Sequence, residues 1–214
     1  MTDPMERRSN MLKGIDISKW NGSIDFAKVR EAGYSFVLIR AGYGKDSRQI
    51  DPLFEKNYLL AKNAGLSIGA YWYSYATTPE DARREADTFL QVVKGKHFDF
   101  PLYMDVEEKK QFSIGRDLLG LVISDFLTTL ENAGYFAGLY MSKSPLTQYL
   151  PQDIGERFSL WVAQYNFKCT YKGPYGIWQK SSRGNVPGVT GHVDIDISYV
   201  DFPKVIKSHH LNGY

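Results

Sequence analysis

The chain has 214 residues and a mass of 24.4 kDa, and with 43% hydrophobic and 23% charged residues its composition is typical of one globular domain. The 26 basic and 24 acidic residues give a net charge of +2 and are interspersed, which argues against nucleic acid as a partner. One cysteine excludes an internal disulfide, four histidines are too few for a metal centre, and no stretch approaches the ~20 apolar residues of a membrane span. We therefore expect no cofactor, no metal and no membrane insertion; the sequence does not indicate the oligomeric state, for which a monomer is the default.

Short β-prone runs alternate with amphipathic helical patterns along the chain. At three junctions a glycine closes a helix and a β-rich run follows at once, and these glycines are Gly33, Gly65 and Gly134. Glycine readily adopts the left-handed conformation that ends a helix, so the three junctions are typical of αβ connections. Proline signals also predict helix starts, for helices over 53–64 and 82–93.

Eight segments are predicted as strands: 12–18, 35–40, 67–75, 100–107, 136–142, 158–165, 175–181 and 191–198. With helices between them, the longest over 118–130, they predict a (β/α)8 barrel. The connections among the last three strands are short and rich in glycine, proline and serine. The predicted fold is therefore an irregular α/β barrel with eight strands and fewer than eight helices. An open doubly wound sheet is the alternative, but no glycine-rich phosphate turn follows the first strand.

The barrel is expected to occupy residues 11–208 as a single catalytic domain, with 209–214 as a tail. Residues 1–10 are polar and lack the apolar region of a signal peptide. Because Met11 directly precedes the first predicted strand, we expect residues 1–10 to be an expression tag or a disordered extension.

Carboxylates fall in three strands whose ends would form the mouth of the barrel. Asp16 lies in the first strand, Asp105 and Glu107 end the fourth, and Asp194 and Asp196 lie in the eighth. Residues i and i+2 share a face, and the first and eighth strands are neighbours in a closed barrel, so these acids should converge. Like charges in a partly dry cleft cannot all stay ionised, and a protonated carboxyl beside an ionised one suits glycoside hydrolysis. Solvated acids at strand ends are the alternative that spacing alone leaves open.

Aromatic residues gather in the later parts of the predicted strands. They are Tyr71, Trp72, Tyr73, Tyr75, Tyr140, Trp161, Tyr165 and Trp178. Sugar rings stack on aromatic rings while their hydroxyls meet polar side chains, so an acidic cleft lined with aromatics favours an oligosaccharide ligand. Packing in the barrel core is the alternative for any one of them.

Several dispersed motifs occur in order between Lys13 and about Asp201: GIDISKWNG, RAGYG, GAYWYSY, YMDVE, GLYMS, LWVAQY, IWQ and GHVDIDIS. Together they resemble the family 25 glycoside hydrolases, the N-acetylmuramidase lysozymes of phage endolysins and bacterial autolysins. The resemblance implies an irregular β/α barrel that binds peptidoglycan glycan strands and cleaves the β-1,4 bond between N-acetylmuramic acid and N-acetylglucosamine. It also implies that the protein acts on the bacterial cell wall. A phage enzyme would reach the wall from the host cytoplasm at lysis, and a bacterial enzyme would reach it by secretion with removal of a signal peptide.

The same resemblance assigns roles to the acids. Glu107 matches the general acid and Asp105 its partner, while Asp16 and Asp194 complete the cluster. One route uses the substrate's acetamido oxygen as the nucleophile, oriented by Asp105, and retains the anomeric configuration. Direct inversion, with water activated by Asp194 or Asp16, stays open.

Tyr71, Tyr140 and Trp161 fall where the family places aromatic groups around the saccharide. Gln164 and Gln179 are secondary candidates for polar contacts, and Asp196 is a further substrate-binding candidate. Two positions depart from the common family pattern. Trp72 stands where many members have histidine, and Asp196 where many have asparagine, so the local charge differs from that of a typical member.

Two other functions remain open at this stage. One is a catalytically inactive barrel that binds glycan through the same aromatics. The other is a chitinase-like glycosidase, although such enzymes usually carry a longer acidic run than YMDVE on the fourth strand. A metal-dependent deacetylase would need histidines clustered with aspartate, which the sequence does not supply.

Overall fold

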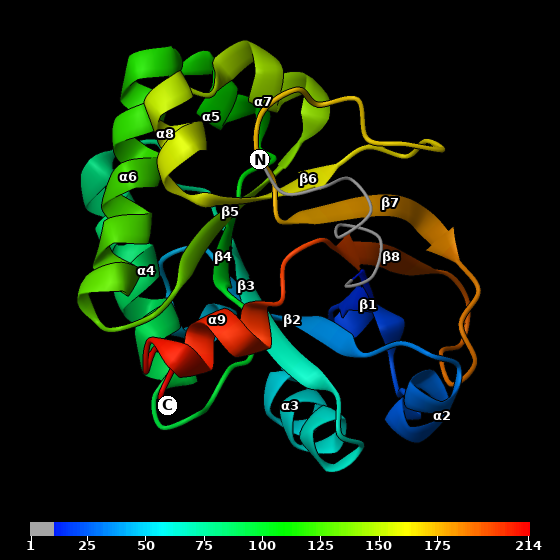
Figure 1. The fold of residues 1–214 in the computed structure, drawn as a ribbon. Coiled ribbons are helices and arrows are strands. Elements are labelled where there is room, and N and C mark those ends of the chain that lie inside the picture. The colour runs from blue at the N-terminus through cyan, green and yellow to red at the C-terminus, as the bar shows by residue number, and fades with distance from the viewer. Residues whose placement is uncertain (1–10) are drawn as a thin grey trace.

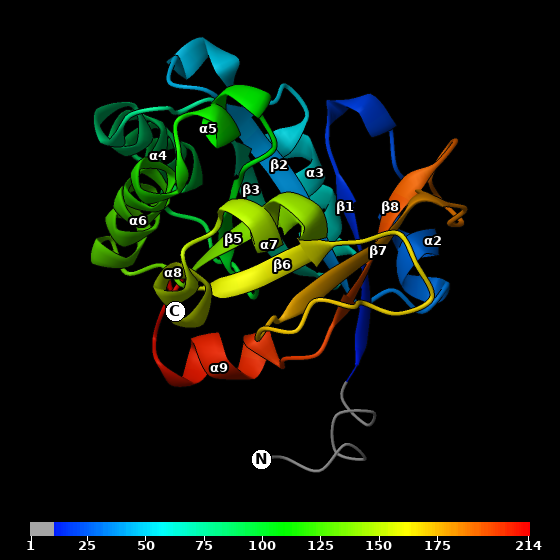
Figure 2. The same ribbon diagram turned by 90° about the horizontal axis from the view of Figure 1, so that it is seen from above.

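The computed structural model describes residues 11–214, so the predicted extension 1–10 lies outside the described residues. Eight strands form one closed barrel in the order of the sequence (Figures 1 and 2). They are β1 (Leu12–Ile17), β2 (Phe36–Tyr43), β3 (Ser67–Tyr73), β4 (Leu102–Asp105), β5 (Ala137–Ser142), β6 (Ser159–Ala163), β7 (Ile177–Gly184) and β8 (Val193–Ser198). The predicted strands are therefore all present, with their ends shifted by a few residues.

The barrel is mixed rather than all parallel. β1 to β7 run parallel to their neighbours, whereas β8 is antiparallel to both β7 and β1. The amino end of β8 consequently lies beside the carboxyl ends of the other strands, where Asp194 pairs with Asp16 and Asp196 pairs with Gly14. Asp194 reaches the mouth because it comes early in a reversed strand, and Asp196 lies one pleat deeper.

The helices are unevenly distributed around the barrel (Figure 1). They are α2 (Phe26–Glu31), α3 (Phe54–Asn63), α4 (Pro79–Val93), α5 (Lys109–Ser113), α6 (Arg116–Asn132), α7 (Lys143–Tyr149), α8 (Gln152–Arg157) and α9 (Phe202–Ser208), with short 3-10 helices η1 (Lys19–Asn21) and η2 (Ser47–Gln49). Within residues 11–214, the connections β6–β7 and β7–β8 contain no helix. The predicted irregular barrel is thus confirmed. The described residues contain eight α-helical segments, because the β4–β5 and β5–β6 connections hold two helices each and α9 follows β8.

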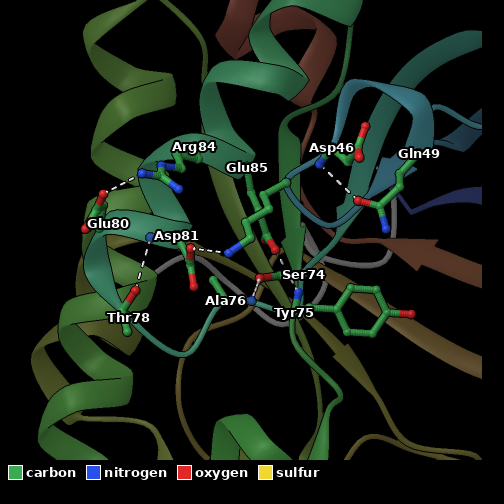
Figure 3. Close-up of polar contacts among 11 residues, drawn as sticks. Asp46, Gln49, Ser74, Tyr75, Ala76, Thr78, Glu80, Asp81, Arg84 and Glu85 are labelled. Atoms are coloured by element: carbon green, nitrogen blue, oxygen red, sulfur yellow. Dashed lines mark hydrogen bonds and ion pairs between the residues drawn. The ribbon is translucent and has the colours of Figure 1, made fainter.

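Local sequence signals explain where these helices begin and end. Gly33, Gly65 and Gly134 have φ of 88°, 73° and 87°, the left-handed conformation expected at the three αβ junctions. At the start of α4, the Thr78 side chain accepts a hydrogen bond from the backbone N–H of Asp81 at 3.2 Å (Figure 3). The helix thereby starts at Pro79, directly after this cap, as the proline signal indicates.

The barrel interior is filled below the mouth. Phe36 and Phe100 stack with ring centroids 4.3 Å apart, and Phe202 of α9 packs on Phe100 at 5.5 Å. Residues 209–214, expected as a tail, contribute to this closed end. Asn212 is fully buried, donates from Nδ2 to the carbonyl of Phe100 at 2.8 Å and accepts from the backbone N–H of Phe136 at 2.7 Å. Any ligand site inside the barrel is therefore restricted to the mouth.

No helix in residues 11–214 combines the length and the apolar character needed to cross a membrane.

A buried carboxyl group lies between α4 and the end of β3 (Figure 3). Glu85 is 1% exposed, and its Oε1 accepts a hydrogen bond from the backbone N–H of Tyr75 at 3.0 Å. Its other oxygen, Oε2, is buried without a hydrogen-bond partner. Burial raises the pKa of Glu85 to about 7, against a smaller lowering by the Ser74 hydroxyl and the Tyr75 N–H. Glu85 therefore fixes the backbone that follows β3 while remaining a poorly solvated acid.

Replacing Glu85 with glutamine should change how stability depends on pH. The pKa is about 7 in the folded protein and 4.5 as the reference for the unfolded chain, so the wild type loses stability as pH rises from 4.5 to 7. Glutamine does not ionise. The free energy of unfolding of Glu85→Gln, taken relative to that of wild type, should therefore rise by up to about 3 kcal/mol between pH 4 and pH 8. Denaturant unfolding at both pH values measures this difference.

Glu80→Gln is the matched control for this measurement. Glu80 lies on the same helix but is exposed, where it pairs with Arg84 at 2.7 Å. We expect its stability difference from wild type to stay nearly constant with pH. Parallel pH curves for Glu85→Gln and wild type would contradict the raised pKa of Glu85.

Candidate active site

A pocket of about 250 Å³ opens at the mouth of the barrel. It is lined by Asp16, Arg40, Tyr71, Tyr73, Asp105, Glu107, Tyr140, Trp161, Tyr165, Gln179 and Asp194. The four acids that the sequence singled out as catalytic are all among these residues. They meet because β1 and β4 present their carboxyl ends here and the reversed β8 presents its amino end.

Asp16 and Asp105 form the deeper part of this acidic pocket, and both are buried. Burial raises the pKa of Asp16 well above its usual range, and the charges of Asp196 and Asp194 raise it further. Burial also raises the pKa of Asp105, with Glu107 adding to the rise and Arg40 opposing it. Burial and the neighbouring acids therefore both disfavour the ionised forms of Asp16 and Asp105.

Glu107 and Asp194 lie nearer to solvent. Glu107 follows the end of β4 on an exposed rim, and Asp194 is half-buried. Loss of water around the carboxyl raises the pKa of Glu107, the charge of Glu108 adds to this, and the Tyr140 hydroxyl opposes it. Burial raises the pKa of Asp194 to about 6, with Glu107 contributing. A protonated carboxyl at the rim can reach a ligand in the pocket, which is the arrangement that general acid catalysis needs.

Gln179 of β7 connects three sides of the acidic pocket. Its Nε2 donates to Oδ2 of Asp16 at 2.7 Å, and its Oε1 accepts from the hydroxyls of Tyr140 and Tyr165, each at 3.0 Å. These bonds fix the amide orientation, because the carboxylate requires the NH₂ group and the phenols require the carbonyl. The network holds Asp16 and Tyr140 in place before any ligand binds.

The aromatic floor of the pocket consists of the three rings that the sequence predicted as saccharide contacts. Trp161 packs edge to face with Tyr140 at 4.4 Å and with Tyr71 at 5.7 Å between ring centroids. Tyr103 lies below, 5.3 Å from Trp161. All four rings are buried, and Tyr71, Tyr140 and Trp161 line the pocket whereas Tyr103 does not.

The structure does not bring two of the predicted substrate-binding residues into the acidic pocket. Asp196 is fully buried beneath the floor and accepts a hydrogen bond from Nε1 of Trp161 at 2.8 Å, because the reversal of β8 places it deeper than Asp194. Gln164 lies past the end of β6, where its side chain accepts from the backbone N–H of Thr170 at 2.7 Å. A direct contact of either residue with a ligand in the acidic pocket therefore finds no support in the geometry.

Trp72, which departs from the common family pattern, points outward from the barrel. Its ring packs against Phe89 of α4 at 5.5 Å, and its Nε1 donates to the carbonyl of Gly44 at 2.9 Å. For this residue, packing outside the barrel is the correct interpretation.

Arg40 is a pocket residue that the sequence analysis missed. Its Nε donates to Oδ2 of Asp51 at 2.9 Å, and Asp51 is itself buried. The charge of Arg40 lowers the pKa of Asp105, so it favours ionisation of the deepest acid in β4. The sequence did contain a signal, because Arg40 is a charged residue at the end of the apolar run FVLIR. Charged side chains are rarely buried unless they are paired, so an arginine at this strand end indicates a site.

Across residues 11–214 there is no group of three or more histidine, cysteine or acidic side chains arranged to hold a metal ion. What the acidic pocket offers is proton transfer by carboxyl groups, electrostatic stabilisation by carboxylates, and aromatic contacts for a sugar.

Comparisons with known proteins agree with this chemistry. The family described as glycosyl hydrolases family 25 matches residues 15–189. Uncharacterized protein YegX of Escherichia coli K12 is 31% identical over 201 residues, covering 88% of this chain and 70% of that protein. The autolytic lysozyme of Clostridium acetobutylicum is 33% identical over 190 residues, covering 86% of this chain and 55% of that protein. The solved structure of the modular autolysin LytC of Streptococcus pneumoniae with a synthetic peptidoglycan ligand is similar at a TM-score of 0.79 and 28% identity, covering 88% of this chain and 46% of that one. The chain therefore belongs to family 25 of the glycosyl hydrolases.

Proposed function

We propose that this protein is a lysozyme that cleaves the β-1,4 bond between N-acetylmuramic acid and N-acetylglucosamine in peptidoglycan. The observation that carries the proposal is the convergence of Asp16, Asp105, Glu107 and Asp194 on one aromatic-floored pocket in a barrel of this family. A relative named as an autolytic lysozyme, and LytC with its peptidoglycan ligand, support the choice of substrate. The catalytic domain predicted over residues 11–208 is proposed to include residues 209–214, whose Asn212 is buried in the barrel, and to act on the bacterial cell wall.

In this proposal Glu107 is the general acid. Its position on the exposed rim allows it to reach a glycosidic oxygen, and its raised pKa favours the protonated form. It gives its proton to the leaving oxygen as the bond to the anomeric carbon breaks. The ionised Glu107 then takes a proton from the water that completes hydrolysis.

Asp105 is proposed to orient the 2-acetamido group of the substrate. Its Oδ1 is buried without a hydrogen-bond partner, so an acceptor is available for the acetamido N–H. The acetamido carbonyl oxygen would attack the anomeric carbon to form a positive ring. Arg40 and the developing positive charge both favour ionisation of Asp105, whose carboxylate would then stabilise that ring. Attack of water on that ring restores the acetamido group and retains the anomeric configuration.

Direct inversion is the competing mechanism, with Asp194 or Asp16 activating a water molecule. Asp194 is half-buried at the mouth, which permits contact with water, whereas Asp16 is engaged by Gln179 at 2.7 Å. Of the two, Asp194 is the better candidate for a base, and the stereochemistry of the product distinguishes the mechanisms.

Clearing of a purified cell-wall suspension tests the proposed function. The wild-type protein should reduce the turbidity, since cleaved glycan strands dissolve. A barrel that only binds glycan would leave the turbidity unchanged while sedimenting with the walls. A chitin suspension assayed in parallel addresses the chitinase-like alternative, and release of sugar from chitin but not from walls would contradict the proposal.

A further inference from the structure

A second hollow of about 290 Å³ adjoins the acidic pocket, and we refer to it as the side pocket. It is lined by Lys19, Trp20, Arg40, Tyr43, Tyr73 and Tyr75. Arg40 and Tyr73 line both hollows, so the side pocket and the acidic pocket are immediate neighbours. A ligand seated over Glu107 could therefore extend into it without leaving the protein surface.

The side pocket differs from the acidic pocket in charge. Its lining holds two cations and four aromatic rings but no carboxylate. Asp51 neutralises Arg40, with Nη2 and Oδ2 2.8 Å apart. The Lys19 ammonium lies 4.8 Å from the centroid of the Trp20 ring, and within residues 11–214 it forms no ion pair with a carboxylate. Lys19 thus contributes an uncompensated positive charge.

The wall that carries Lys19 is held in place before a ligand binds. Ser18 caps η1 by accepting a hydrogen bond from the backbone N–H of Trp20 at 3.3 Å. The backbone N–H of Lys19 donates to Oδ2 of Asp51 at 2.9 Å, and the same oxygen accepts from Arg40. One buried carboxylate therefore fixes the Arg40 side chain and the backbone of Lys19, so the base of this wall is ordered before a ligand binds.

The opposite wall is aromatic and is anchored through Glu85. The Glu85 carboxylate holds the backbone of Tyr75, and Figure 3 shows the Tyr75 ring pointing away from α4. This ring packs on Tyr73 at 5.2 Å and on Tyr43 at 6.3 Å. Tyr75 is nevertheless 48% exposed, and Trp20, which lines the same pocket, is 79% exposed. Large apolar rings grouped in the open beside a reactive pocket are typical of a binding surface.

We propose that the side pocket binds the acidic peptide carried by the muramic acid of peptidoglycan. Lys19 pairs with a peptide carboxylate, while Trp20 and Tyr75 pack against the aliphatic parts of the peptide. This inference rests on the proposed function, because it is the substrate of that function that carries a carboxylate-bearing peptide next to the scissile bond. An uncharged sugar would use the rings but would have no need of an unpaired ammonium group.

The test compares two substrates that differ only in charge. Soluble peptidoglycan fragments are used as they are, or after their peptide carboxylates have been converted to amides. Wild type should cleave the untreated fragments with a kcat/KM about tenfold higher than the amidated ones. Lys19→Met should lower kcat/KM about tenfold on untreated fragments and leave it within about twofold on amidated ones. Lys19→Arg should retain the preference of the wild type.

Lys62→Met is the matched control. The Lys62 ammonium also lies over an aromatic ring, 5.7 Å from the centroid of Tyr58, but it is on α3 and outside both hollows. This variant should behave as wild type on both substrates. Thermal unfolding of each variant checks that it is folded, and if Lys19→Met is unfolded, the substrate preference of the wild type decides the matter.

Three results would overturn the inference. They are equal losses by Lys19→Met on the two substrates, no loss on either, or a wild type that cleaves both equally well. A wild type that cleaves neither substrate would instead overturn the proposed function itself, and the role of the side pocket with it.

Discussion

Glu107→Gln is expected to lower kcat on peptidoglycan about 10³-fold while leaving the affinity for glycan strands within about twofold. Glutamine keeps the size and the hydrogen-bonding atoms of the side chain but has no proton to give to the leaving oxygen. Turnover of soluble fragments measures the loss, and co-sedimentation with cell walls measures binding. Activity within tenfold of wild type would show that another group is the general acid.

Glu108→Gln changes the residue next to Glu107. It is expected to shift the pH dependence of kcat/KM rather than to abolish turnover. The Glu108 carboxylate accepts a hydrogen bond from the Tyr73 hydroxyl at 2.8 Å, and its charge raises the pKa of Glu107. A general acid acts while protonated, so activity falls as pH rises through its pKa. Removing the charge of Glu108 should lower the pKa of Glu107 and move the alkaline limb of kcat/KM to lower pH. A limb that stays in place or moves to higher pH would argue against Glu107 as the titrating acid.

Asp105→Asn should lower kcat about 10²-fold, because the variant keeps an acceptor for the acetamido N–H but loses the charge that stabilises the positive intermediate. Asp194→Asn is the comparison and should lower kcat less than tenfold. The configuration of the first product, followed by NMR, provides an independent reading. Retention of the anomeric configuration is expected. An initially inverted product, or a larger loss of kcat in Asp194→Asn than in Asp105→Asn, would favour a mechanism in which Asp194 activates water.

Much of the fold could be predicted because the signals are local. Each αβ junction is marked by a glycine that takes positive φ, as at Gly33 and Gly65, and each strand by a short β-rich run. The direction of β8 was a missed inference. Only residues 185–192 separate it from β7, and a parallel connection needs a dozen or more residues, so the sequence already favoured an antiparallel pair.

The site was predictable to the extent that it follows strand order and alternation. Asp105 and Glu107 share a face two residues apart, and closure of the barrel places Asp16 beside Asp194. Two other features could not be predicted in this way. Asp196 is buried because β8 is reversed, and Arg40 is positioned by its partner Asp51. Asp196 is held by Trp161 from 35 residues away, and no local pattern encodes that contact.

The side pocket was not predicted as a site, because its residues are divided among three separate motifs, GIDISKWNG, RAGYG and GAYWYSY. Lys19 and Trp20 follow β1, whereas Tyr43 ends β2 and Tyr75 follows β3. Each is an ordinary residue for a strand end or a loop, and only the closure of the barrel brings them to one side of the acidic pocket.

The bond that is cleaved tests the central claim most directly. Purified peptidoglycan is digested with the wild-type protein, the new reducing ends are reduced with borohydride, and the modified sugars are identified after hydrolysis. The proposed lysozyme activity predicts that N-acetylmuramic acid stands at the new reducing ends. New ends consisting of N-acetylglucosamine, or no new reducing ends at all, would contradict it.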